Sequence, residues 1–173
     1  ILGIAWYENL GGGVIDTTQQ VIITNTFGIE SIYSADIDND GDMDVLAASG
    51  NSDKIIWNEN LGGGIFGPQQ IISTNTNGAW SVYAADLDGD GDLDVLSASQ
   101  SDSKIAWYEN IGGVIDTTQK IISTNAIGTR SVYAADLDND GEMDVLSASG
   151  GDNKIAWYKN LGGGNFGSQK IIS

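Results

Sequence analysis

Hydrophobic residues in this chain occur in short runs, separated by stretches rich in Gly, Asn and Asp. Four successive runs recur, and we name them strands A, B, C and D: SVYAADLD at 131–138, DVLSAS at 144–149, KIAWYEN at 104–110 and QKIIST at 119–124. Short apolar runs that are rich in β-branched and aromatic residues and bounded by turn residues predict strands. Few windows show the apolar period of a helix, so the pattern predicts an all-β protein.

The four runs form a tandem repeat. Equivalent aromatic residues lie 50 positions apart, at Trp57, Trp107 and Trp157 and at Tyr33, Tyr83 and Tyr133. Strands joined by short turns pair as an antiparallel meander, so each repeat forms one small sheet. Strand A carries small residues such as Ala84 and Ala85, as a crowded innermost strand needs, and strand C has apolar side chains on both faces. A four-stranded sheet that recurs every ~40 to 50 residues predicts β-propeller blades, whereas a solenoid would need shorter, parallel coils.

The repeats divide the chain into about three and a half blades within one domain, 1–173. Ile4 to Asn9 matches strand C and Gln19 to Asn25 matches strand D, so residues 1–25 form a half-blade. Full blades follow at 30–75, 80–125 and 130–173. Because a propeller ring takes roughly 4 to 8 blades, we expect a partial ring that belongs to a longer array or is completed by other copies of the chain.

Composition narrows the possible partners. The net charge of −17 argues against nucleic acid and anionic membranes, and no apolar run approaches the ~20 residues of a membrane span. The chain has no Cys and no His, so a metal site would have to use oxygen ligands. Fifteen of the 24 acidic residues lie in three loops between strands A and B, at 36–44, 86–94 and 136–144. The acidity is therefore concentrated at candidate cation sites.

The three loops, DIDNDGDMD, DLDGDGDLD and DLDNDGEMD, have acids at positions 1, 3, 5, 7 and 9 and Gly at position 6. A hard divalent cation takes six to eight oxygens, and a tight loop points alternate side chains inward while Gly permits the sharp turn. We expect position 7 to contribute its backbone carbonyl as a ligand, and the acid at position 9 to complete the coordination shell of the ion. The candidate ligands are Asp36, Asp38, Asp40, Asp42, Asp44, Asp86, Asp88, Asp90, Asp92, Asp94, Asp136, Asp138, Asp140, Glu142 and Asp144.

Calcium is the expected ion, because magnesium keeps more of its waters than so many carboxylates would allow. The loops differ from EF-hands, since position 12 is Ala47, Ser97 or Ser147 instead of Glu and both flanks are strands. The alternative to a calcium site is an acidic, solvated hairpin turn that binds no ion. Such a turn would not require the same arrangement of acids and glycine in all three repeats. We expect the three ions to be structural, because five acids within nine residues repel one another until a cation locks the hairpin.

The chain resembles the FG-GAP/VCBS repeat family, the blades of the integrin α-subunit propeller and of many bacterial surface proteins. The resemblance is carried by the DxDxDGxxD loops, by GAWSVYAADLDGDGDLDVLSAS at 78–99 and by KIAWYEN followed later by glycines. It implies a calcium-binding propeller and matches the loop acids named above to the family's ligands, with position 7 through its backbone. The Phe-Gly element survives at 66–67 and 166–167, whereas VIDTTQ replaces it at 14–19 and 114–119.

A partner is expected on the face opposite the acidic loops. In a meander, the B-to-C and D-to-A turns emerge together on that face, where the repeats differ most. Trp80 is a candidate for stacking on a sugar ring. The other candidate ligand-binding residues are Arg130, Glu30, Asp53, Asp102 and Asp152. Sequence drift at exposed turns, and packing of Trp80 between blades, are the alternatives.

These features predict a calcium-stabilised binding or adhesion module, extracellular or at the cell surface, with a lectin as the most specific version and a glycan or protein as partner. A structural repeat that self-associates through open blade edges into a ring or filament is the alternative. A third hypothesis is the propeller domain of a polysaccharide lyase or glycosidase. We expect no enzyme, because the nine acids outside the loops form no recognisable acid/base pair and the chain lacks a His or Cys to act as base or nucleophile.

Overall fold

A computed structural model describes residues 3–24 and 26–173. The described residues form strands and turns without a helix, in agreement with the all-β prediction. They accordingly contain no helix long and apolar enough to cross a membrane. Of the predicted half-blade at 1–25, residues Ile1, Leu2 and Asn25 lie outside the described part of the chain.

Three four-stranded antiparallel sheets follow one another along the chain, and we call them blades 1, 2 and 3. In each sheet the spatial order of the strands is the order of the sequence, so the predicted A-B-C-D meander is confirmed. The strands are β5 (Ile29–Ala35), β6 (Asp44–Ser49), β7 (Lys54–Asn58) and β8 (Gln70–Ser73) in blade 1; β9 (Ala79–Ala85), β10 (Asp94–Ser99), β11 (Lys104–Tyr108) and β12 (Lys120–Ser123) in blade 2; and β13 (Thr129–Ala135), β14 (Asp144–Ser149), β15 (Lys154–Tyr158) and β16 (Lys170–Ile171) in blade 3.

The N-terminal half-blade consists of β1 (Gly3–Trp6) paired with β4 (Gln20–Thr24), which match strands C and D. Between them lies a short ribbon of β2 (Asn9–Gly11) and β3 (Val14–Ile15), in a stretch for which sequence analysis predicted no strand. The blades have a single bridge at the same place, for example Asn110 with Ile115. Three and a half blades leave the ring open, and its completion by further blades stays a prediction.

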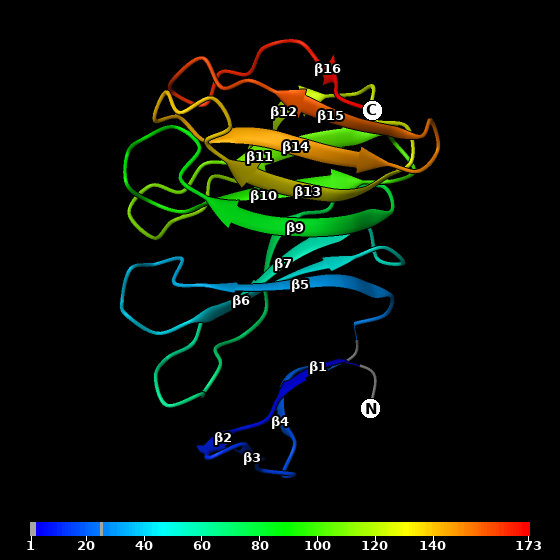
Figure 1. Ribbon diagram of the computed structural model, residues 1–173. Coiled ribbons are helices and arrows are strands. Elements are labelled where there is room, and N and C mark those ends of the chain that lie inside the picture. The colour runs from blue at the N-terminus through cyan, green and yellow to red at the C-terminus, as the bar shows by residue number, and fades with distance from the viewer. Residues whose placement is uncertain (1–2, 25) are drawn as a thin grey trace.

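The A strands line the inside of the array. β9 contacts both β5 and β13, and the rings of Tyr33, Tyr83 and Tyr133 stack with centroids 4.6 and 4.8 Å apart. Figure 1 shows β5, β9 and β13 running side by side through the middle of the molecule. Small residues such as Ala84 and Ala134 are buried in these strands, which confirms the prediction that strand A is innermost.

The core lies between successive blades. Leu46 and Ile55 of blade 1 pack against Val82 and Val95 of blade 2 in one cluster, and a second cluster joins blades 2 and 3 in the same way. β10 is buried along its whole length, because a neighbouring blade covers each of its faces. The strand C tryptophans Trp57 and Trp107 are buried, whereas Trp6 and Trp157, in the first and last sheets, are half-buried.

The connections emerge at two opposite ends of the blades (Figure 1). At the loop end, the acidic A-to-B loops lie beside the C-to-D loops, as the hydrogen bond of 2.7 Å from the Gly112 nitrogen to Asp92 shows. At the turn end, the Gly78 nitrogen of a D-to-A link donates to Asp53 of a B-to-C turn, also at 2.7 Å. The predicted separation of the acidic loops from the other turns is confirmed.

Candidate functional site

The acidic loops are tight hairpins whose shape depends on two left-handed residues. The position-6 glycines Gly41, Gly91 and Gly141 have φ of 96°, 97° and 94°. Position 4 is also left-handed, with φ of 60° at Asn39, 84° at Gly89 and 61° at Asn139. Only Gly, and to a lesser extent Asn, adopts this conformation at little cost. The sequence pattern Asn or Gly at position 4 and Gly at position 6 therefore closes each loop.

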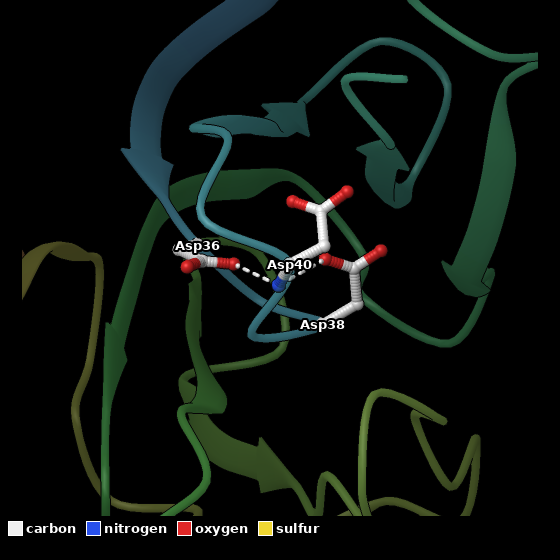
Figure 2. A group of neighbouring side chains, drawn as sticks. All are labelled: Asp36, Asp38 and Asp40. Carbon is white, nitrogen blue, oxygen red and sulfur yellow. Dashed lines mark hydrogen bonds between the residues drawn. The ribbon is translucent and has the colours of Figure 1, made fainter. Parts of the chain in front are cut away.

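The first carboxylate of each loop organises the backbone. In the first loop, the Asp40 nitrogen donates to Asp36 Oδ1 at 3.1 Å, and the Gly41 nitrogen donates to Asp36 Oδ2 at 3.0 Å. The Asp40 nitrogen also lies 3.3 Å from Asp38 Oδ1, and Figure 2 shows both contacts of this nitrogen. Asp136 accepts the equivalent pair of bonds in the third loop, whereas Asp86 accepts bonds from the nitrogens of Gly89 and Gly91 in the second. These bonds orient the first carboxylate of each loop relative to the loop backbone.

Each loop brings three carboxylates together. In every group, one oxygen per residue lies within 4.8 Å of the other two. Two oxygens bound to one calcium ion at about 2.3 to 2.6 Å are at most roughly 5 Å apart, so the groups fit such an ion. The members are Asp36, Asp38 and Asp40 in the first loop; Asp86, Asp88 and Asp90 in the second; and Asp136, Asp138 and Asp144 in the third.

The position-9 acids Asp44, Asp94 and Asp144 are fully buried beneath the loops. Asp94 accepts a hydrogen bond of 2.8 Å from the Leu87 nitrogen and one of 2.9 Å from the Asn110 nitrogen. Burial raises the pKa of Asp94 to about 7 despite these two bonds. A nearby cation would favour the carboxylate form, and each oxygen keeps a second lone pair. The role of the position-9 acids as metal ligands stays a prediction. The hydrogen bonds of Asp94 show a second role, which is to join the end of strand A to the end of strand C.

The side chain of position 7 points away from its own loop in blade 2. Asp92 accepts a hydrogen bond of 2.9 Å from Asn39 Nδ2 in the loop of blade 1 and one of 2.7 Å from the Gly112 nitrogen. The Asp92 side chain is thus engaged between loops, and the predicted use of the backbone carbonyl at Asp42, Asp92 and Glu142 stays a prediction.

Sequence analysis missed the asparagine that follows strand C in each blade. Asn110 Nδ2 donates to the Leu93 carbonyl at 3.1 Å and to the Ile37 carbonyl of blade 1 at 2.7 Å. Asn160 makes the same pair of bonds, to Met143 and to Leu87 of blade 2. The buried amide thus ties the acidic loops of neighbouring blades together. Its recurrence at 50-residue intervals was the available signal.

The residue before this asparagine differs between blades. It is Glu59 in blade 1, Glu109 in blade 2 and Lys159 in blade 3. Burial and the charge of Asp90 raise the pKa of Asp88, and contact with the Glu109 carboxyl adds to the rise.

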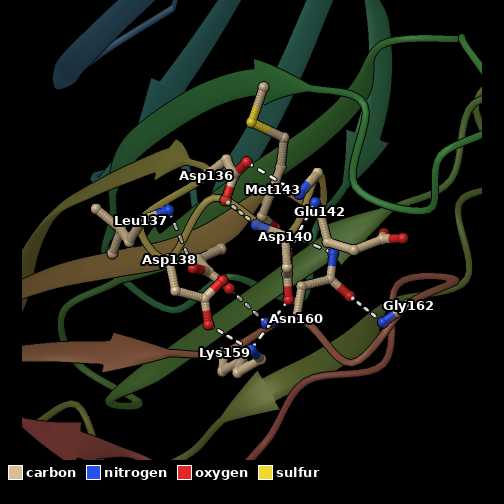
Figure 3. Close-up of polar contacts among 11 residues, drawn as sticks. Asp136, Leu137, Asp138, Asp140, Glu142, Met143, Lys159, Asn160 and Gly162 are labelled. Atoms are coloured by element: carbon tan, nitrogen blue, oxygen red, sulfur yellow. Dashed lines mark hydrogen bonds and ion pairs between the residues drawn. The ribbon is translucent and has the colours of Figure 1, made fainter.

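In blade 3, Lys159 Nζ contacts Asp138 and lies 3.0 Å from Asp140 Oδ2. These contacts raise the pKa of Lys159 and lower that of Asp140. Figure 3 shows this ammonium group among the loop carboxylates.

The candidate ligand-binding residues at the turn end are only partly brought together. Arg130 lies over the ring of Trp80, with its guanidinium carbon 5.2 Å from the ring centroid, so these two form one surface across blades 2 and 3. Glu30 is exposed on β5 of blade 1. The acids of the B-to-C turns are engaged locally, Asp53 with the Gly78 nitrogen and Asp102 and Asp152 with nearby lysines.

A recurring groove between neighbouring blades was also missed. Between blades 1 and 2 it has a volume of about 380 Å³ and is lined by Trp57 and Gln70 on one side and Val114 and Ile115 on the other. Similar grooves run beside Trp107 and beside Trp6. One wall is the C-to-D loop of the next blade, where the Phe-Gly element alternates with VIDTTQ, so that alternation shapes the grooves.

The family of the chain follows from its sequence. The sequence profile of the FG-GAP-like repeat matches residues 3–47, 36–97 and 86–147. The chain belongs to the FG-GAP-like repeat family. Each match in this FG-GAP-like protein ends within a strand B, so it includes at least one acidic loop. A comparison with curated protein sequences finds no significant match.

A solved structure shares the fold of this FG-GAP-like chain. It is a lectin from Agrocybe aegerita that specifically recognises non-reducing terminal N-acetylglucosamine. The two chains are 22% identical, with a TM-score of 0.69 over 98% of this chain and 47% of the lectin. This FG-GAP-like chain therefore spans about half the length of that lectin, and at this identity the likeness shows a common fold.

Proposed function

We propose that this chain is a calcium-stabilised, carbohydrate-binding module that acts outside the cell or at its surface. The observation that carries the carbohydrate part is the common fold with a lectin over 98% of the chain. The calcium part is supported by three loops in which carboxylate oxygens converge within 4.8 Å.

Calcium would act on stability rather than on a reaction. Each acidic loop connects strands A and B of its own blade, and asparagine bonds such as Asn110 to Ile37 tie it to the next blade. Five acids in such a loop repel one another, and a bound ion would replace that repulsion by attraction. The ions would hold several blades together through residues that are already joined by hydrogen bonds.

An extracellular location is proposed because the loops suit calcium at high concentration. Extracellular calcium modules bind the ion with dissociation constants of roughly 10⁻⁴ to 10⁻³ M. The loop carboxylates are largely exposed or half-buried apart from position 9, which suits such binding.

We place the glycan surface at the turn end, around Trp80 and Arg130. Aromatic rings bind the apolar faces of sugars, and a guanidinium group can donate to hydroxyl oxygens. Both residues lie at the start of a strand A, β9 or β13, and the acidic loops follow the other end of these strands, so the two functions use different surfaces. We infer a binding role without catalysis, because Asp53, Asp102 and Asp152 are engaged by backbone or lysine groups.

Binding of the calcium-loaded protein to a glycan array that includes glycans ending in N-acetylglucosamine tests this proposal. We expect binding to a defined set of glycans, and we expect Trp80→Ala to weaken it by at least about tenfold, since a stacking ring is lost. Tyr7→Ala is the matched control, because it removes an exposed aromatic ring from the half-blade. A folded wild-type protein that binds no glycan would contradict the carbohydrate part.

A further inference from the structure

The three acidic loops differ in the charge that faces them from strand C. The residue just before the asparagine that follows strand C is acidic in blades 1 and 2 and basic in blade 3. These residues are Glu59, Glu109 and Lys159. The rest of the loop sequence is nearly the same in the three blades. The third loop differs from the other two at this position and at position 7, where Glu142 replaces an aspartate, and only this position changes the sign of the charge.

Lys159 lies within the candidate cation site of blade 3. Its ammonium group contacts Asp138 and lies 3.0 Å from Asp140, and its side chain is 29% exposed (Figure 3). These are positions 3 and 5 of the loop, the positions that converge with position 1 in the other two blades.

The carboxylates of the third loop are arranged differently from the other two. Asp140 does not join the converging group of its loop, which instead contains Asp144, whereas Asp40 and Asp90 do join theirs. The change occurs at the residue that faces Lys159. The lysine thus already occupies part of the ligand set that calcium would use.

We propose that Lys159 is a built-in counter-cation that makes the third loop the weakest calcium site of this chain. The inference rests on the proposed calcium binding and specifies it further: two loops depend on the ion, and the third is held closed by its own lysine. At calcium concentrations that fill the first two loops, blade 3 keeps its hairpin without an ion.

The size of the effect follows from elementary electrostatics. Calcium would have to displace or approach the Lys159 ammonium group, whereas the second site is faced by the Glu109 carboxylate, which pairs with Lys120 at 2.7 Å. Even at the high dielectric constant of a protein surface, such a change beside a divalent ion alters its affinity by roughly tenfold or more. The screening of exposed charges by salt reduces the effect but does not reverse its sign.

Calorimetric titration of the chelator-stripped protein with calcium tests the proposal. We expect two tighter sites and a third site that is at least about tenfold weaker. Lys159→Glu should convert this profile into three sites of similar affinity, and Glu109→Lys should leave a single tight site. Lys54→Glu is the control, since it makes the same charge change in β7 at the turn end, away from the loops.

The outcomes separate this inference from the proposed function. Three equal sites in the wild type, unchanged by Lys159→Glu, would overturn the role of Lys159 and leave calcium binding intact. No binding by the wild type or by either loop variant would overturn the calcium proposal and this inference with it. An equal gain of affinity in Lys54→Glu would show that net charge alone is responsible, and would also overturn the role of Lys159.

Discussion

At the scale of single residues, the asparagine after strand C connects the parts of the site. Asn110 accepts a hydrogen bond from the Gly113 nitrogen, and its amide group donates to carbonyls of two different loops. The side chain is completely buried, so its donors cannot be replaced by water without rearrangement. Asn60 makes the corresponding bonds within blade 1, and among residues 3–24 and 26–173 its amide bonds to no second acidic loop.

We expect Asn110→Ala to destabilise the protein more than Asn60→Ala does. Both variants lose the bonds inside one blade, and only Asn110→Ala also leaves the Ile37 carbonyl without its partner. An unsatisfied buried polar group costs about 1 to 3 kcal/mol of the free energy of unfolding. Urea unfolding followed by tryptophan fluorescence measures the difference, and equal losses in the two variants would show that the bond between blades contributes nothing.

Sequence reasoning located the loop acids and missed these asparagines for a physical reason. The spacing of acids within nine residues is local, so a single loop already indicates a cation site. The partner of Asn110, Ile37, lies 73 positions away, and only the packing of neighbouring blades brings them together. The lysine at position 159 can be read from the sequence, but its contact with the acidic loop of blade 3 depends on strand C ending beside that loop.

At the scale of elements, the A-to-B hairpin is the unit that combines fold and site. Its first carboxylate binds backbone nitrogens of the loop, and its last carboxylate is buried between strand A and the end of strand C. The hairpin was predictable because Gly at position 6 and alternating acids leave few other conformations. The β2–β3 ribbon was not, since its glycines permit many conformations and only the packed structure selects one.

We expect Asp86→Asn to weaken calcium binding at the second loop by about tenfold or more, because a full ligand charge is lost from the site. The asparagine oxygen can still accept one of the two loop hydrogen bonds, so the hairpin should persist. Calorimetric titration measures the affinity. Asp16→Asn is the matched control. The Asp16 carboxylate lies in an exposed turn of the half-blade and also accepts a hydrogen bond from a backbone nitrogen, so its loss removes the same charge and should leave calcium binding unchanged.

At the scale of the whole molecule, stability is shared between blades. Each core cluster contains residues of two neighbouring sheets, so no blade buries its apolar residues alone. The tyrosine stack and the asparagine bonds run in the same direction, from one blade to the next. Repeat arrays of this kind gain stability from interfaces between neighbours, so an ion that fixes one loop should stabilise adjacent blades too.

The net charge of −17 makes this assembly sensitive to cations as a whole. Fifteen acids in three loops are a source of repulsion that folding concentrates at one end of the blades. The propeller architecture and the placement of the loops were predictable from the repeat, because the repeat specifies every sheet in the same way. The number of four-stranded sheets in residues 26–173 was predictable too, from the number of repeats.

Thermal unfolding with and without a calcium chelator tests the central claim most directly. A ligand present at 100 times its dissociation constant stabilises the folded state by ~2.7 kcal/mol per site, and each kcal/mol shifts the midpoint of a chain this size by roughly 2 to 4 °C. We therefore expect EDTA to lower the midpoint by about 10 °C or more, and excess calcium to restore it where magnesium restores it less. An unchanged midpoint in EDTA would contradict the account, because the acidic loops would then hold their shape without an ion.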